Sequence, residues 1–496
     1  MALLDTLAPL RAHSGRRLTV GLDDATVTRS GAAHPLLADA IAAAGVEYAR
    51  VRGEIADLLD LDEDAQIRAV QGGLLSFYSP DTTAPYVALT ARGPWVITLK
   101  GAVLYDSGGY GMLGFGHTPQ AVLDAMAKPQ AMANVMTPSV SQIRFDRAMR
   151  REIGHTRGTC PFERFLCLNS GSESVSLASR IVDVNAKLMT DPGGRHAGKT
   201  IKRVVVKGSF HGRTEKPALY SDSSRKNYAQ HLASFRDEHS VIVVTPYDVA
   251  SLTQAFADAD ANGWFIEAMF LEPVMGEGDP GRAVPRAFYD AARALTTQHG
   301  ALFLIDSIQA GLRAHGVLSV VDYPGFEDAI APDMETYSKA INGGQYPLSV
   351  LAVTPHAASL YRNGTYGNTM TGNPRALDIA TTILSTFTPE LRANIRLRGA
   401  QAVSMLDALR LQHPDCITKA QGTGLLFSCE LGKQFKAYGT GSLEEWLRQH
   451  GLGVIHGGEN SLRFTPHFFI SDDELQLMVS LVKRAIVEGP RREGTA

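Results

Sequence analysis

The chain has few of the features that mark specialised classes of protein. It has four cysteines among 496 residues, at positions 160, 167, 416 and 429. Their spacing fits neither a disulfide framework nor a metal site, which indicates a reducing compartment and no bound metal. A net charge of -3 gives no basic surface for a nucleic-acid polymer. No segment approaches the roughly 18 apolar residues of a membrane span, and residues 1–17 lack a secretory core. We therefore expect a cytoplasmic protein.

What the chain does contain is typical of a globular protein of several domains. Hydrophobic residues make up 44% and charged residues 20% of it, and its length exceeds that of one ordinary core. The sequence predicts a mostly helical N-terminal extension over 1–95, then the first part of a small domain and the entry to a large domain over 96–150. The large domain is expected over 151–375 and a smaller C-terminal α+β domain over 376–496.

Short apolar runs alternate with helical stretches in the predicted large domain. Strands are expected at 165–168, 204–206, 241–244, 268–271, 301–305, 334–337 and 349–353. This alternation is typical of an α/β fold, with a mainly parallel sheet and helices on both of its faces. Outside this region we expect helices at 36–51 and 54–70, a hairpin over 95–105, a long helical stretch over 375–411 broken near Pro389, and a last helix opened by a capping box at Ser471.

Asp306 and Lys339 are the first candidates for chemistry. Asp306 ends an apolar strand, where α/β sheets bind their ligands, and Lys339 follows the next strand. A Lys forms a Schiff base with an aldehyde cofactor, and a buried Asp keeps a pyridine nitrogen protonated. The pair therefore suggests pyridoxal-phosphate chemistry. Taken alone, the pair fits a structural reading better, with Asp306 as a helix cap and Lys339 as a surface residue.

Four further segments also follow strands or precede helices. Each by itself fits an ordinary cap, turn or solvated loop. A strand-to-helix junction with small hydroxyls could bind phosphate through its N–H groups, an aromatic could stack on a flat ring, and an Arg could bind a carboxylate. The segments are Asn169-Ser170-Gly171-Ser172-Glu173, Phe210-His211-Gly212-Arg213-Thr214, Glu272-Pro-Val-Met-Gly-Glu277-Gly278 and Gly367-Asn-Thr369-Met-Thr-Gly-Asn-Pro374.

These segments occur in an order that resembles the class III, ω-type aminotransferases, which are pyridoxal-phosphate enzymes of fold type I. The resemblance covers about residues 96–487 and includes Asp306-x-Ile-Gln309, Ser338-Lys339 and Leu462-Arg463-Phe464. It implies an aspartate-aminotransferase-like fold, with a seven-stranded, mainly parallel sheet and a smaller α+β domain. It also implies pyridoxal 5'-phosphate as cofactor and a homodimer with shared active sites.

The resemblance assigns roles to individual residues. Lys339 would form the Schiff base and move the proton, and Asp306 would pair with the ring nitrogen. The cofactor-binding set would be Ser170, Gly171, Ser172, Phe210, His211, Asp306, Gln309, Lys339 and, from the neighbouring subunit, Thr369. The substrate-binding set would be Arg213 on a distal carboxylate, Arg463 on an α-carboxylate, and Glu277 as a gate that neutralises Arg463.

The chain departs from the family pattern close to this site. Ser307 replaces the usual Glu after the Asp, and 311–316 and 340–347 differ from the usual Gly-rich forms. The leading hypothesis is an aminotransferase that moves an amino group between an amino acid or amine and a keto acid. The departures keep open elimination or replacement, decarboxylation, or carbon–carbon bond formation on an α-amino acid such as S-adenosylmethionine. A third alternative is a non-catalytic relative, against which the joint presence of Lys339, Asp306 and Gln309 argues.

Overall fold

The computed structural model describes residues 3–131, 134–236 and 240–492. The chain forms two compact units. The central unit comprises 121–396 and 422–426, and the terminal unit comprises 1–120, 397–421 and 427–496. The four-part domain division expected from the sequence stays a prediction. No helix in the described part of the chain is long and apolar enough to cross a bilayer.

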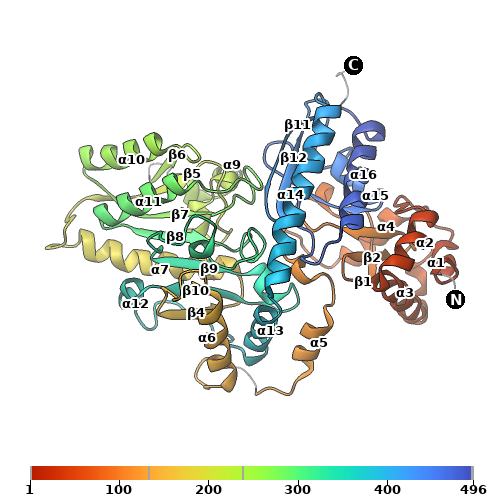
Figure 1. Ribbon diagram of the computed structural model, residues 1–496, viewed down its shortest axis with the longest axis horizontal. Coiled ribbons are helices and arrows are strands. Elements are labelled where there is room, and N and C mark those ends of the chain that lie inside the picture. The colour runs from red at the N-terminus through yellow and green to blue at the C-terminus, as the bar shows by residue number, and fades with distance from the viewer. Residues whose placement is uncertain (1–2, 132–133, 237–239, 493–496) are drawn as a thin grey trace. The chain divides into compact units, whose positions relative to one another are not determined.

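The central unit is built on a seven-stranded sheet of order β4-β10-β9-β8-β7-β5-β6 (Figure 1). The strands β5 to β9 pair in parallel, whereas β10 pairs antiparallel with both β9 and β4. The predicted seven-stranded, mainly parallel sheet is therefore confirmed. Its strands are β4 (Arg164–Leu168), β5 (Thr200–Val206), β6 (Val241–Val244), β7 (Trp264–Leu271), β8 (Leu302–Asp306), β9 (Met334–Tyr337) and β10 (Ser349–Val353).

Helices cover both faces of this sheet because the strands are apolar on both sides. On one face, Val175, Ala178 and Val182 of α7 pack in one core cluster with side chains of the strands. On the other face, α11 places Tyr289 against Phe303 of β8, with 5.4 Å between the ring centroids. The helices of the central unit are α5 (Gln120–Ala127), α6 (Val140–Glu152), α7 (Gly171–Thr190), α8 (Glu215–Tyr220), α9 (Arg225–His231), α10 (Val249–Ala261), α11 (Arg286–His299), α12 (Pro355–Leu360) and α13 (Pro374–Ser385). The helix α14 (Pro389–Gln412) begins in this unit and ends in the other.

The terminal unit contains two four-stranded sheets, of order β1-β2-β3-β13 and β11-β12-β15-β14. Their strands are β1 (Ala88–Arg92), β2 (Trp95–Thr98), β3 (Val103–Asp106), β11 (Ile417–Thr423), β12 (Leu426–Leu431), β13 (Leu452–Gly453), β14 (Ile455–Gly457) and β15 (Ser461–Phe464). Its helices are α1 (Leu3–Arg11), α2 (Asp24–Ala33), α3 (Pro35–Glu54), α4 (Glu63–Gln71), α15 (Leu443–Gln449) and α16 (Asp472–Glu488). The hairpin of β2 and β3 and the capping box of Ser471 confirm two local predictions.

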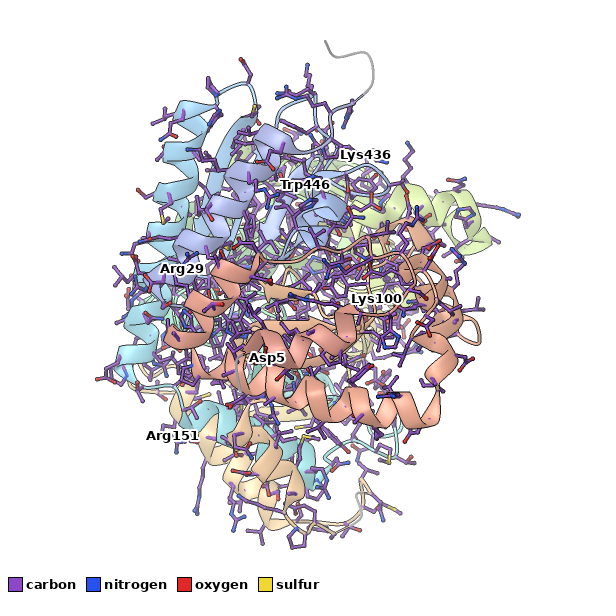
Figure 2. The ribbon with its side chains drawn as sticks, turned by 90° about the vertical axis from the view of Figure 1, so that its right-hand side faces the viewer. Asp5, Arg29, Lys100, Arg151, Lys436 and Trp446 are labelled. Carbon is purple, nitrogen blue, oxygen red and sulfur yellow. The ribbon has the colours of Figure 1, made fainter. Side chains whose placement is uncertain are left out.

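The N-terminal helices fold onto the first sheet of the terminal unit. Lys100, in the hairpin turn, donates from Nζ to the carbonyls of Gly15 and Leu59 at 3.1 Å each. Figure 2 faces these helices and labels Lys100 with Asp5 and Arg29. The single helix predicted over 54–70 was wrong, because the chain turns before α4. There the Glu63 carboxylate accepts from two backbone N–H groups near residue 18, a distant contact that local periodicity does not contain.

Candidate active site

Asp306 and His211 form a buried pair at the end of β8. Asp306 is 5% and His211 1% exposed. His211 Nδ1 lies 2.8 Å from Asp306 Oδ2, and Asp306 Oδ1 accepts from the backbone N–H of Ile308 at 3.1 Å. A carboxylate held in this way favours a cationic partner nearby. His211 Nε2 is buried without a hydrogen-bond partner.

Glu272 is a second buried carboxyl beside this pair. It follows β7 and is 5% exposed. Burial raises the pKa of Glu272 to about 7, His211 opposes that rise, and the charge of Asp306 adds to it. Two buried acids therefore lie close together in different environments, an arrangement that is common at active sites. The sequence motif contained Glu272, but no role was predicted for it.

Lys339 lies in a strained turn directly after β9. It is half-buried and begins a short 3-10 turn, Lys339–Asn342, with a φ of 53°. Such a φ is uncommon for a residue with a side chain and is concentrated at functional sites. Ser338 and Asn342 donate from their side chains to the Leu348 carbonyl, at 2.8 and 3.0 Å, which fixes both ends of the turn.

The first turn of α7 provides N–H groups at a strand-to-helix junction. Ser170 caps the helix, and Glu173 Oε2 accepts from the backbone N–H groups of Asn169 and Ser170 at 2.8 and 3.0 Å. A Cβ added to Gly171 would lie 2.6 Å from Cδ1 of Ile308, so this turn packs closely against the segment after Asp306. Helix N-termini of this kind bind phosphate.

The predicted loop of Phe210 and Arg213 lies beside this helix start. The Arg213 N–H donates to Ser172 Oγ at 3.4 Å, and the Arg213 guanidinium lies 5.2 Å from the Phe210 ring centroid. Arg213 is exposed, as a residue that binds a soluble carboxylate would be. Gln309 is buried, and the half-buried Glu277 lies on the loop after Glu272.

Thr369 and Arg463 belong to two further segments of the chain. Thr369 is exposed in the loop before α13, and its carbonyl accepts from the N–H of Val135 at 3.3 Å. This loop is tied to α7, because Asn368 Nδ2 donates to Glu173 Oε1 at 2.9 Å. Arg463 belongs to the terminal unit, where it is 1% exposed and its guanidinium lies 5.6 Å from the ring centroid of Tyr110.

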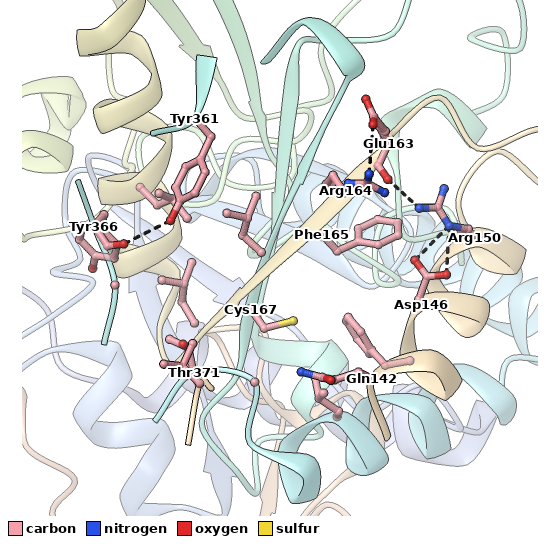
Figure 3. A pocket seen from close by; sticks show the side chains of 18 residues that line it. Gln142, Asp146, Arg150, Glu163, Arg164, Phe165, Cys167, Tyr361, Tyr366 and Thr371 are labelled. Carbon is pink, nitrogen blue, oxygen red and sulfur yellow. Dashed lines mark hydrogen bonds and ion pairs between the residues drawn. The ribbon is translucent and has the colours of Figure 1, made fainter. Parts of the chain in front are cut away.

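A separate cavity of about 410 Å³ lies along the edge strand β4 in the central unit (Figure 3). Phe165 and Cys167 of β4, Gln142 of α6 and Tyr361 contribute to its lining, but Asp306 and Lys339 do not. Burial raises the pKa of the Cys167 thiol to about 12, so it is not a reactive thiolate. The cavity reaches Thr371, two residues from Thr369.

Sequence reasoning missed two structural carboxylates near the site. Glu173 was only the last residue of a motif, yet it holds two backbone N–H groups and Asn368. Glu335, inside β9, is fully buried and accepts from Ser307 Oγ at 2.6 Å. The capping-box spacing Ser170-x-x-Glu173 could have identified the first. A Glu within an apolar strand was the available signal for the second.

The residues of the central unit fit pyridoxal phosphate. A pyridine nitrogen needs an anionic partner, and Asp306 places a buried carboxyl at a strand end, with His211 Nδ1 beside one oxygen and the Ile308 N–H on the other. A phosphate needs N–H groups, which the start of α7 provides beside Ser172. A Lys for covalent attachment follows the strand next to β8.

Comparison with known proteins agrees with this geometry. The family model for class III aminotransferases matches residues 77–486. This match begins before residue 96, where the resemblance by motifs begins. The acetylornithine aminotransferase of Xanthomonas axonopodis pv. citri is 30% identical over 327 residues, which cover 65% of this chain and 74% of that protein. The acetylornithine/succinyldiaminopimelate aminotransferase of Yersinia pestis is 27% identical over 424 residues, 83% of this chain and 95% of that protein.

Solved structures share the fold. The ornithine aminotransferase from Toxoplasma gondii ME49 superposes with a TM-score of 0.72 at 22% identity, covering 87% of this chain and 97% of that one. The likeness confirms the predicted fold type I architecture. Together with the family match over most of the chain, it leads to one conclusion: the protein belongs to the class III aminotransferase family and is a pyridoxal-phosphate-dependent transferase.

Proposed function

We propose that the protein moves an amino group between an amino acid or amine and a keto acid, with Lys339 as the catalytic base. The observation that supports this most is that Asp306, paired with His211, ends β8, while the strained Lys339 turn directly follows the neighbouring strand β9. When bound, the cofactor supplies an electron sink for the substrate's α-carbon.

Each candidate site residue of the central unit would then have its own role. Lys339 would attach the cofactor and, once displaced by the substrate amine, carry a proton at the reacting carbon. Asp306, oriented by His211, would keep the ring nitrogen protonated. Ser170, Gly171 and Ser172 would bind the phosphate, Phe210 would stack on the ring, and Gln309 would approach its phenolic oxygen.

The substrate residues suggest molecules with carboxylates. Arg213 and Arg463 would each bind one carboxylate, with Glu277 as the gate that the family resemblance implies. Several relatives are named for acetylornithine or succinylornithine, which carry an amine distant from a carboxylate. We therefore propose an ω-amino acid as donor and a keto acid as acceptor, in the cytoplasm.

We further propose a homodimer with shared active sites. Thr369, assigned to the neighbour's phosphate, is exposed. An exposed apolar patch lies on the segment 135–143 and on Met370, which directly follows Thr369. Such a patch suits a protein partner. We call it the 135–143 patch; it consists of Val135 at 58%, Met136 at 83%, Val140 at 64%, Ile143 at 49% and Met370 at 51% exposure.

The test is an absorbance scan of the purified holoenzyme between about 300 and 550 nm with a donor alone. Conversion of the cofactor from its aldehyde to its amine form, stoichiometric with donor and reversed by a keto acid, is the expected result. Repeated turnover of an amino acid without a keto acid would instead support elimination, replacement, decarboxylation or bond formation. A Lys339→Ala variant is the matched control and should show no conversion.

A further inference from the structure

One carboxylate joins two loops of the central unit. Glu272 Oε2 accepts from the backbone N–H of Phe210 at 3.0 Å, and Glu272 Oε1 accepts from the backbone N–H of Gly276 at 2.9 Å. Phe210 lies 62 residues before Glu272, on the loop after β5, whereas Gly276 opens the loop that carries Glu277. Both oxygens of this buried carboxyl therefore hold backbone groups rather than side chains.

The two loops also meet where only glycine fits. A Cβ added to Gly278 would overlap the carbonyl oxygen of Gly208, and a Cβ added to Gly276 would overlap Oε1 of Gln309. The backbones of the two loops therefore meet at Gly278 and Gly208, on one side of Glu277, whereas Gly276 on its other side packs against the Gln309 side chain from the segment after β8. In such close packing, a shift of one loop must move the other or break the contact.

We propose that Glu272 is a positioning residue that locks the Glu277 loop to the Phe210 loop, and that protonation of its carboxyl loosens this lock. The inference rests on the proposed function for the roles of Phe210 and Glu277. Its consequence is that the placement of the gate residue relative to the cofactor-stacking residue depends on the charge of a group that itself touches no substrate.

The charges around Glu272 support a change near neutral pH. Three titratable groups face Glu272: His211 from the Phe210 loop, Asp306 from the end of β8, and Tyr247 from the segment after β6. Burial raises the pKa of Glu272 to about 7, with His211 opposing the rise and Asp306 increasing it. Above that pH, an ionised carboxylate accepts two charge-assisted hydrogen bonds. Below it, one oxygen carries a proton and becomes a weaker acceptor.

The experiment is amide hydrogen–deuterium exchange on the full-length holoenzyme without substrate, followed in peptides that cover 207–214 and 274–281. In Glu272→Gln, the side-chain amide has only one acceptor oxygen, so the N–H of Phe210 or Gly276 loses its partner. We expect that peptide to exchange about tenfold faster at pH 8, as the loss of one buried hydrogen bond predicts. Asp279→Asn, which removes one charge from the same loop where Asp279 pairs with Arg282 at 3.4 Å, is the matched control and should exchange like the wild type.

Unchanged exchange of both peptides in a folded Glu272→Gln protein would overturn the proposal. If that variant does not fold, the pH dependence of exchange in the wild-type protein tests the proposal. After correction for intrinsic rates, protection of at least one of the two peptides must fall when the pH is lowered from 8 to 6, and constant protection of both would refute the lock. Because no substrate is present, this result is independent of whether the holoenzyme transaminates.

A kinetic readout separates positioning from a merely structural role. In the wild type, we expect the KM for the carboxylate-bearing acceptor to rise several-fold from pH 8 to pH 6, with a smaller change in kcat. In Glu272→Gln that pH dependence of KM should disappear. An equal pH dependence in both proteins would argue against the proposal, even if the exchange data showed loosened loops.

Discussion

At the scale of single residues, a glycine controls where Gln309 can lie. Gly276 has no room for a side chain, because a Cβ there would overlap Gln309 Oε1. That oxygen is the end of a flexible side chain, so an added methyl group would displace Gln309 rather than the backbone. Since the family resemblance places Gln309 near the phenolic oxygen of the cofactor, the added methyl group should weaken cofactor binding.

We therefore expect Gly276→Ala to weaken cofactor affinity by roughly 5- to 150-fold, which corresponds to the overpacking cost of about 1–3 kcal/mol. In a Gln309→Ala background, Gly276→Ala should leave cofactor affinity almost unchanged, because the side-chain atoms that the methyl group would overlap are gone. Titration of the apoprotein with pyridoxal phosphate, followed by tryptophan fluorescence, gives the four dissociation constants of this double-mutant cycle.

Gly278→Ala is the control for that cycle. A Cβ at Gly278 would overlap the backbone oxygen of Gly208, which cannot rotate away. The loss of cofactor affinity caused by Gly278→Ala should therefore be the same with and without the Gln309 side chain. A Gly276→Ala penalty that is equally independent of Gln309 would mean that the methyl group acts through the loop backbone.

At the scale of elements, β8 and β9 are joined beyond their ladder by a buried acid. Glu335 in β9 accepts from Ser307 Oγ at 2.6 Å and from the N–H of Val320 at 2.9 Å, and Ser319 Oγ also donates to it. Ser307 directly follows Asp306, so this cluster holds the segment that carries Asp306, the proposed partner of the ring nitrogen. Burial raises the pKa of Glu335 to about 7 despite these donors.

The raised pKa of Glu335 predicts a loss of stability with rising pH. The folded state retains the proton at higher pH than the unfolded state, so this contribution is present at low pH and is lost as pH rises through about 7. From pH 6 to pH 8, Glu335 alone should lower the free energy of unfolding by about 1.4 kcal/mol. In Glu335→Gln, which imitates the protonated form, that part of the decrease should be absent.

Denaturant melts of both proteins at pH 6 and pH 8 measure this difference. Glu272 titrates in the same range, but it is present in both proteins and cancels in the comparison. Equal decreases in the two proteins would show that Glu335 does not change its charge over this interval.

At the scale of the whole molecule, the 135–143 patch should determine assembly. Met136→Glu together with Val140→Glu would place two charges in the surface that we propose a second copy covers, a desolvation cost that an interface of ordinary size does not tolerate. We expect the protein to shift from dimer to monomer in light scattering. We also expect it to lose cofactor on gel filtration, because Thr369 would no longer reach the neighbour's phosphate.

Leu188→Glu, on α7 and 53% exposed, adds a charge to an apolar surface residue outside the patch. It should leave the mass and the bound cofactor unchanged. A double variant that stays dimeric would place the interface elsewhere.

The sequence by itself determined the local elements and the order of the motifs. The strands predicted at 241–244, 334–337 and 349–353 have the bounds of β6, β9 and β10, because strands buried on both faces are continuous apolar runs. The start of α16 followed in the same way from the capping box at Ser471. In each case the signal lies within a few residues and does not depend on distant neighbours.

Only the tertiary structure decided which polar residues are buried and which segments pair. The strands β1 and β11 went unpredicted, and the Lys, Gln and Gly in β11 are weak strand formers held there by their neighbours. The sequence around Glu272 and Glu335 does not give the pKa of either carboxyl. Desolvation by burial raises their pKa values, and hydrogen bonds from residues tens of positions away, such as Phe210 to Glu272 and Ser307 to Glu335, oppose that rise. The charge state of a buried acid is a property of everything packed around it, and that environment exists only once the chain has folded.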